Sequence, residues 1–236
     1  MKLVSFDVEG KDRLGLLVEN NIYPVFELNP SLPLNMKSFL EAGEEAMEIL
    51  GRLEQHIRNE PRKFNSYPLP SMMLLAPVPR PTSCRDGYAF RQHVETARRN
   101  RKVPMIPEFD SYPVFYFTNH NSMIGPGDVP CMPDHFQKLD FELEVAIVIG
   151  KGGRNIRAKD ADSYIAGYTV MNDLSARTLQ MEEMLLNLGP AKGKDFATAI
   201  GPSLVTPDEL ASYLVPPPKG HVGNQYDRKM KAFVNG

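Results

Sequence analysis

The chain has 236 residues, of which 42% are hydrophobic and 24% charged, so it is neither an intrinsically disordered chain nor a collagen-like repeat. Its 27 lysines and arginines nearly balance 29 aspartates and glutamates, and a net charge of −2 argues against a nucleic-acid partner. No apolar run approaches the roughly 18 residues of a membrane-spanning helix, and the first 18 residues lack the apolar centre of a signal peptide.

The two cysteines, Cys84 and Cys131, lie far apart in the sequence. Without a CxxC pair, the sequence excludes a thiolate metal site and gives no sign of a disulfide framework. We therefore expect a reduced, cytoplasmic protein with no membrane partner. The 21 prolines and 17 glycines favour many loops and turns over a helical bundle.

The first 70 residues contain the elements of a small α+β domain. Apolar and β-branched runs predict strands over residues 2–8, 14–18 and 22–28. Apolar side chains recur every three or four positions over residues 38–57 and predict a helix with one buried face. Because residues 58–70 are polar and rich in proline, we predict an N-terminal domain at 1–70 and a second, catalytic domain at 71–236.

The elements after residue 70 are mostly short. Helices are predicted over residues 160–165 and 174–186, and residues 86–97 form a helix or a loop that leads into one. Thr206-Pro207-Asp208-Glu209 has the form of a capping box with proline at the first helical position, so a helix is expected to begin there. The predicted strands cover residues 114–118, 139–149, 166–172, 196–200, 203–205 and 229–234.

The strand predicted over residues 139–149 has an unusual polar face. Side chains alternate between the faces of a strand, so Asp140, Glu142 and Glu144 share one face while Phe141, Leu143, Val145 and Ile147 share the other. A solvated face normally mixes charges of both signs, but this face has three successive carboxylates and no cation. Repulsion among them would be relieved by a divalent ion with oxygen ligands. The pattern leaves two interpretations open: a solvated strand face or a metal site.

A second group of polar residues follows the strand predicted at 166–172. Asp173 ends that strand, and Arg177 and Gln180 lie three residues apart, so they share a helix face. The alternative is an ordinary exposed Asp–Arg pair, which stabilises a helix by only about 0.3 kcal/mol.

Lys194 and His93 are the remaining candidates. The segment from Gly189 to Asp195 superficially resembles a phosphate-binding loop, but it has three residues between its glycines where that loop needs four, so we reject a nucleotide site. Lys194 is then either an oxyanion donor held in a turn or a solvent-exposed lysine. His93 is the histidine set among the most polar residues, and its alternative is a structural role.

Together these segments resemble the fumarylacetoacetate hydrolase family, most closely its fumarylacetoacetase-like members. The resemblance runs from about residue 70 to 236, and it implies a β-rich α+β fold built as a mixed β-sandwich roll. Residues 1 to about 70 resemble the family's small N-terminal domain. The motifs that carry the resemblance are Asp86 with His93 seven residues later, Asp140-Phe141-Glu142-Leu143-Glu144, Met171 to Arg177 with Gln180, and Gly193-Lys194-Asp195-Phe196 before Ala199-Ile200-Gly201-Pro202.

The resemblance also implies a metal-dependent site that hydrolyses a C–C bond in a β-diketo acid, fumarylacetoacetate or a related acylpyruvate. A divalent cation, Mg²⁺ before Ca²⁺ or Mn²⁺, would polarise a carbonyl and stabilise the departing enolate. His93 would act as general base on a water, and Tyr88 would contact the substrate. The implied metal ligands are Asp86, Glu142, Glu144 and Asp173, and the implied substrate-binding and oxyanion-stabilising residues are Arg177, Gln180 and Lys194.

Alternatives remain within and outside the enzyme class. Relatives with the same metal site decarboxylate, hydrate or tautomerise 2-oxo acids, and His93 favours hydrolysis among these. The family's barrel continues beyond the residue where this sequence stops, so we expect its closing strands to be absent. That absence favours a non-catalytic metal-binding homologue, whereas retention of His93, Arg177, Gln180 and Lys194 favours an enzyme. The resemblance also implies a homodimer and a place in aromatic amino acid catabolism.

Overall fold

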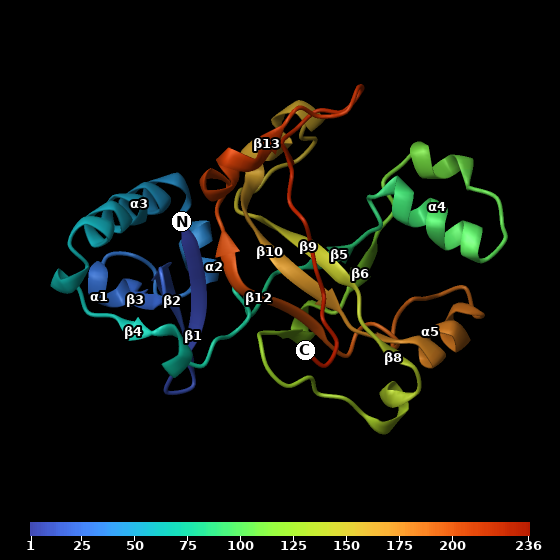
Figure 1. Ribbon diagram of the computed structural model, residues 1–236, viewed down its shortest axis with the longest axis horizontal. Coiled ribbons are helices and arrows are strands. Elements are labelled where there is room, and N and C mark those ends of the chain that lie inside the picture. The colour runs from blue at the N-terminus through green and yellow to red at the C-terminus, as the bar shows by residue number, and fades with distance from the viewer.

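The computed structural model describes residues 1–236 and has a strand-rich α+β fold, as expected (Figure 1). Its α-helices are α1 (Val25–Leu28), α2 (Met36–Glu41), α3 (Gly43–Asn59), α4 (Arg91–Asn100) and α5 (Arg177–Met184). The longer strands are β1 (Lys2–Val8), β2 (Lys11–Val18), β3 (Asn21–Pro24), β9 (Leu143–Ile149), β10 (Ile165–Asp173) and β12 (Thr198–Val205).

The shorter strands and the 3₁₀ helices fill the connections. The short strands are β4 (Tyr67–Pro68), β5 (Cys84–Asp86), β6 (Tyr116–Thr118), β7 (Met123–Ile124), β8 (Leu139–Asp140), β11 (Ser175–Ala176), β13 (Leu214–Val215) and β14 (Gln225–Tyr226). The 3₁₀ helices are η1 (Pro61–Lys63), η2 (Leu69–Ser71), η3 (Pro107–Asp110), η4 (His120–Ser122), η5 (Pro133–Phe136), η6 (Ala158–Tyr164) and η7 (Pro207–Tyr213). No helix is both long enough and apolar enough to cross a lipid bilayer.

One eight-stranded sheet runs through the molecule in the order β4-β3-β2-β1-β12-β10-β9, and β7 pairs with β12 in parallel. The strands along the main order pair antiparallel, and the sheet does not close into a barrel. Three two-stranded ribbons stand beside it: β5 with β6, β8 with β11, and β13 with β14. β9 is therefore an edge strand of the main sheet.

The largest core lies between the N-terminal strands and helices α2 and α3. Sixteen buried residues form it, among them Leu3, Leu16, Phe39, Leu50 and Ile57. The predicted helix over 38–57 is confirmed in its buried face but divided, because Gly43 adopts a left-handed φ of +76° that ends α2 and lets α3 begin. The strand predicted over 22–28 likewise stops at Pro24, and α1 follows.

The sheet crosses the predicted boundary at residue 70. β1 pairs with β12 through Lys2 with Val205 and Leu3 with Leu204, and the backbone of residues 73 and 75 hydrogen-bonds with that of Asp7 and Ser5. In Figure 1 the N-terminal strands and α3 lie on the left and α4 and α5 on the right, joined through β12. The division into 1–70 and 71–236 stays a prediction.

The strand predicted over 139–149 differs from the structure in two respects. It is divided into β8 and β9, because β8 pairs with β11 and β9 pairs with β10. Its apolar face is also the outward one: Val145, Ile147 and Ile149 are 45%, 53% and 61% exposed. The inward face carries Glu144, then Ala146 and Val148, both of which pack against buried core clusters. Glu144 therefore faces the interior, whereas Asp140 on β8 is exposed.

Near the C-terminal end, one predicted strand is absent and the predicted capping box is not formed. Residues 229–234 form no strand. A helix does begin at Pro207 as expected, in the form of the 3₁₀ helix η7. The Thr206 hydroxyl does not cap it, because this hydroxyl lies 2.6 Å from the Met1 ammonium and donates to the Met1 carbonyl. The strands expected at 196–200 and 203–205 are joined in the single strand β12, which begins two residues later than expected, at Thr198.

Candidate active site

Three carboxylates from three strands meet on the inner face of the sheet. Asp86 ends β5, Glu144 is the second residue of β9, and Asp173 ends β10. One oxygen of each lies within 4.8 Å of one oxygen of each of the others. We call these three residues the acidic cluster. Asp86 and Asp173 are buried and Glu144 is half-buried.

Strand pairing explains why Glu144 and Asp173 converge. Glu144 lies directly opposite Met171 in the antiparallel pair of β9 and β10, so both side chains point to the same face. Asp173 follows Met171 by two residues and therefore also points to that face. Asp86 reaches the cluster from outside the sheet, on the ribbon of β5 and β6 that lies beside β9 and β10 in Figure 1.

The acidic cluster does not tolerate three negative charges by itself. Burial raises the pKa of Glu144 to about 8, helped by the charges of Asp86, Asp173 and Glu142. Burial also raises the pKa of Asp173 to about 6, although the Lys194 ammonium opposes the shift. One oxygen of Asp173, Oδ1, is buried without a hydrogen-bond partner. An all-oxygen set of carboxylates with an unpartnered buried oxygen fits a divalent cation.

A basic group closes one side of the cluster. The Lys194 side chain is almost fully buried, and its Nζ lies 2.6 Å from Glu142 Oε2 and 2.6 Å from Asp173 Oδ2. Of the two interpretations of Lys194, the structure excludes an exposed lysine. A buried ammonium beside the carboxylates supplies positive charge where an anionic oxygen could be bound.

Glu142 is not part of the acidic cluster and instead forms ion pairs with two basic side chains. Its Oε1 accepts a 2.7 Å hydrogen bond from Arg177, which also donates to Asp140 at 2.8 Å and to Gln180 at 3.1 Å. Burial alone would raise the pKa of Glu142, but hydrogen bonds from Lys194 and Arg177 outweigh it and hold that pKa below its ordinary value. Arg177, Gln180 and Lys194 thus lie together, as their predicted shared role requires, and a metal-ligand role for Glu142 stays a prediction.

Tyr116 is a site residue that the sequence reasoning missed. It faces Asp86 across the β5–β6 ribbon, and its hydroxyl oxygen lies 3.1 Å from Asp86 Oδ2 and 2.8 Å from Asp173 Oδ2. Burial and the neighbouring charges of Asp173 and Asp86 raise its pKa above the ordinary value. Only the pairing of two strands 30 residues apart reveals this contact, and no local motif marks it.

The side chains of His93 and Tyr88 make no hydrogen bond or ion pair with the acidic cluster. His93 is exposed on α4, and its ring makes no hydrogen bond or ion pair. Tyr88 is exposed and stacks on Phe109, with ring centres 6.2 Å apart. In Figure 1 α4 projects from the right of the molecule, away from β9 and β10. Their catalytic and substrate-binding roles stay predictions.

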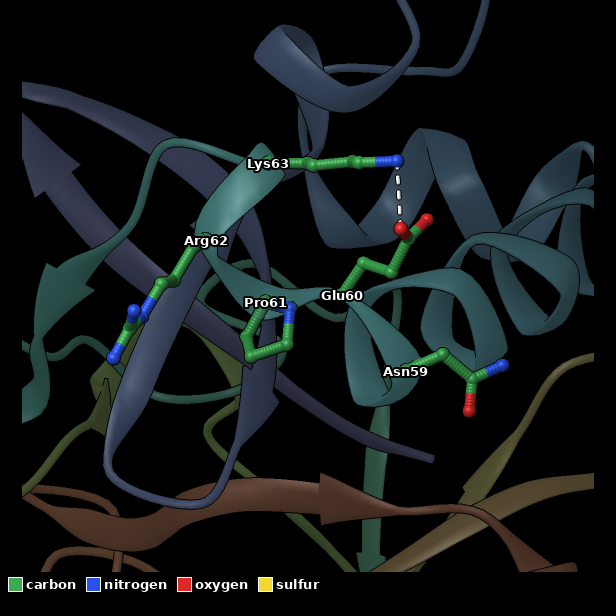
Figure 2. Close-up of a pocket in the computed structure, with 5 residues that line it drawn as sticks. All are labelled: Asn59, Glu60, Pro61, Arg62 and Lys63. Atoms are coloured by element: carbon green, nitrogen blue, oxygen red, sulfur yellow. Dashed lines mark ion pairs between the residues drawn. The ribbon is translucent and has the colours of Figure 1, made fainter.

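Two surface cavities lie outside this site. A polar groove of about 310 Å³ lies at the end of α3 (Figure 2), where Lys63 and Glu60 form an ion pair at 2.6 Å. A second cavity of about 500 Å³ lies between the outward faces of β9 and β10 and residues 231–235. Neither contains a residue of the acidic cluster.

Comparison with known proteins identifies the family of which the site is part. The family model described as fumarylacetoacetate (FAA) hydrolase, C-terminal, matches residues 82–236. Among curated relatives, the mitochondrial oxaloacetate tautomerase fahd2 of Xenopus laevis is 33% identical over 220 residues and the human FAHD2A protein of the same name is 35% identical over 224. Each alignment covers 89% of this chain, which spans only 63% and 64% of the length of those relatives.

Solved structures show the same fold at lower identity. A fumarylacetoacetate hydrolase from Exiguobacterium antarcticum matches with a TM-score of 0.64 and 23% identity, over 91% of this chain and 69% of that one. A maleylpyruvate hydrolase from Sphingobium, solved with manganese(II) and pyruvate, matches with a TM-score of 0.59 and 21% identity, over 89% and 69%.

Proposed function

The chain belongs to the fumarylacetoacetate hydrolase family, and from that premise we propose that it is a metal-dependent enzyme that interconverts the keto and enol forms of a 2-oxo acid. The observation that carries the proposal is the buried Lys194 ammonium, 2.6 Å from two carboxylates at the edge of the acidic cluster. Oxaloacetate is the first substrate to test, because two relatives at 33% and 35% identity are named oxaloacetate tautomerases.

The acidic cluster would hold the metal. Asp86, Glu144 and Asp173 offer three carboxylates, and Glu142 is the candidate fourth ligand. Oxygen-only ligands suit Mg²⁺ and Mn²⁺ equally. A divalent cation bound there would act as a Lewis acid on a substrate carbonyl and so make the adjacent C–H bond more acidic.

The residues around the cluster would bind and orient the oxo acid. Arg177 and Gln180 present donors suited to a substrate carboxylate, because a guanidinium pairs with a carboxylate through two parallel hydrogen bonds. The Lys194 ammonium would neutralise the charge that develops on the oxo oxygen as the α-proton leaves. Burial of Lys194 strengthens this interaction, because few waters compete with it.

Tautomerisation requires fewer catalytic groups in the site than hydrolysis does. Hydrolysis requires a base within hydrogen-bond reach of an attacking water. His93, the predicted base, is exposed on α4, and its ring makes no hydrogen bond or ion pair with the acidic cluster. In a keto–enol exchange the α-proton would pass to solvent water and the oxo oxygen would take a proton from solvent water in return, so the exchange needs no base that activates a nucleophile, and the described geometry favours it.

C–C bond hydrolysis of an acylpyruvate is the second candidate. The spacing of His93, seven residues after Asp86, favours it, since the ribbon that carries Asp86 leads directly into α4. This reaction would require α4 to approach the cluster when substrate binds, whereas tautomerisation would not.

One series of assays distinguishes tautomerisation from C–C bond hydrolysis. With oxaloacetate and Mg²⁺ or Mn²⁺, we expect the enol absorbance to equilibrate faster than in buffer, and Lys194→Ala to lower kcat/KM by about 10²-fold. His93→Ala should leave this rate unchanged. With an acylpyruvate, products of C–C cleavage that vanish in His93→Ala would support hydrolysis instead. Equilibration that is no faster with the wild type and either metal than in buffer would overturn the tautomerase proposal, whereas loss of the rate in His93→Ala would show that His93 takes part in the exchange.

A further inference from the structure

A carboxylate from α5 fills a nest of backbone amides. Glu183 Oε1 accepts hydrogen bonds from the N–H groups of Ala191 at 2.7 Å and Gly193 at 3.1 Å, and Oε2 accepts one from Lys192 at 2.7 Å. Three successive amides that point at one site form an anion-binding concavity. Here the anion is a side chain of the same chain, eight to ten residues earlier in the sequence.

The residue that follows this nest is Lys194. The hydrogen bonds from the amides of residues 191–193 to Glu183 therefore constrain the backbone that leads into Lys194. The Gly193 carbonyl also accepts a 2.8 Å hydrogen bond from Ala176 N, just before α5. Gly193 packs so closely on α5 that an added Cβ would lie 2.6 Å from Gln180 Cβ and 2.7 Å from Gln180 N. The loop and α5 thus form one unit, with Glu183 as its charged contact.

We propose that Glu183 is a positioning residue, whose carboxylate holds the backbone of residues 191–193 against α5 and so places the Lys194 ammonium at the acidic cluster. Glu183 itself makes no contact with the cluster. The functional consequence rests on the proposed role of Lys194, but the positioning claim does not. Glu182, its neighbour on α5, is exposed and its side chain makes no hydrogen bond, so it serves as a matched control.

The first test measures the exposure of Lys194 directly. An amine-reactive label and peptide mass spectrometry report the modification rate of Lys194, with exposed Lys192 in the same peptide as an internal reference. We expect Glu183→Ala to raise the Lys194 rate, relative to Lys192, by about tenfold. Glu182→Ala should leave it at the wild-type value. An unchanged Lys194 rate in Glu183→Ala would overturn the proposal.

A rescue experiment separates positioning from general destabilisation. Sodium acetate should refill the nest in Glu183→Ala and restore protection of Lys194, while sodium chloride at equal ionic strength should not. Equal protection by the two salts would overturn the role of a bound carboxylate. If Glu183→Ala fails to fold, Glu183→Gln carries the test. The amide keeps one acceptor oxygen, so Lys194 should be labelled at an intermediate rate, and a wild-type rate would contradict the proposal.

Activity then distinguishes this proposal from the proposed function. With oxaloacetate, misplaced Lys194 should lower kcat more than it raises KM, because its charge acts on the oxygen that becomes negative during reaction. If labelling shows Lys194 released and the rate stays at the wild-type value, the catalytic role of Lys194 fails while the positioning claim stands. If no tautomerase activity exists in the wild type, labelling still decides the positioning claim.

Discussion

Glu144 has a carboxyl group that the folded protein prefers to keep protonated. Burial, and then the charges of Asp86, Asp173 and Glu142, raise its pKa from 4.5 to about 8. The unfolded chain at neutral pH has already released that proton. Asp173 adds to the effect, since burial raises its pKa from 3.8 to about 6. Without metal, the acidic cluster therefore lowers the free energy of unfolding by an amount that depends on pH, and a bound cation would remove this destabilisation.

The free energy of unfolding of the metal-free protein should fall as pH rises from about 5 to 8. The folded state binds more protons than the unfolded state across this window, so raising the pH favours unfolding. For Glu144 the loss is on the order of 2 kcal/mol after allowance for its partial exposure, or about 4–8 °C in Tm. Thermal melts at several pH values measure it.

Two comparisons make this prediction specific. Glu144→Gln cannot ionise, so its Tm should vary less with pH, and Mg²⁺ at millimolar concentration should restore the Tm of the wild type at pH 8. Glu182→Gln, on the exposed side of α5, should behave as the wild type does. A wild-type Tm that stays constant from pH 5 to 8 without metal would contradict the assignment of Glu144 to a crowded acidic site.

At the scale of elements, the strand β9 exposes its more apolar face and turns the face that carries Glu144 toward the interior. Val148 points inward and packs against the main core, whereas its neighbour Ile147 is 53% exposed. Ile147→Thr should therefore change the free energy of unfolding by less than about 0.5 kcal/mol. Val148→Thr should cost on the order of 1–2 kcal/mol, because it buries a hydroxyl.

Urea denaturation of the two variants measures this difference. The dye ANS, which fluoresces on exposed apolar surface, should bind Ile147→Thr less than the wild type, since the outward faces of β9 and β10 expose several apolar side chains together. If Ile147→Thr destabilises the chain as much as Val148→Thr does, the outward face of β9 is covered in solution.

The same strand shows what the sequence could and could not predict. Alternation of side chains predicted the strand, because period two is a local property of the chain. That Asp86 and Asp173 lie near Glu144 was implied only by the family resemblance. Alternation did not predict the division into β8 and β9 or the inward face, because both depend on which strands pair with them. The contacts of Tyr116 and Glu183 were missed for a related reason: each joins segments that become neighbours only after folding. Lys194 was recognised as a candidate, but only burial separated its two interpretations.

At the scale of the whole molecule, the sheet joins two segments that composition had separated at residue 70. Leu204 on β12 is fully buried and belongs to the same core cluster as Leu3 and Leu50 of the N-terminal segment. Met1 adds to the junction, since its ammonium lies 2.9 Å from Asp208 in η7. A sheet and a core that cross the boundary should make the two segments unfold together.

Leu204→Ala should therefore weaken both segments at once. Removal of a fully buried leucine costs about 2–4 kcal/mol, and hydrogen exchange should rise together in α3, before the boundary, and in β10, after it. Leu214→Ala is the matched control, because Leu214 is 47% exposed on the short ribbon of β13 and β14. If β10 loses protection in Leu204→Ala while α3 keeps its wild-type exchange rates, residues 1–70 fold as an independent domain and the β1–β12 pairing is a contact between domains. Common loss of protection would make the sheet a single cooperative unit, and the acidic cluster would then depend on the N-terminal core for its stability.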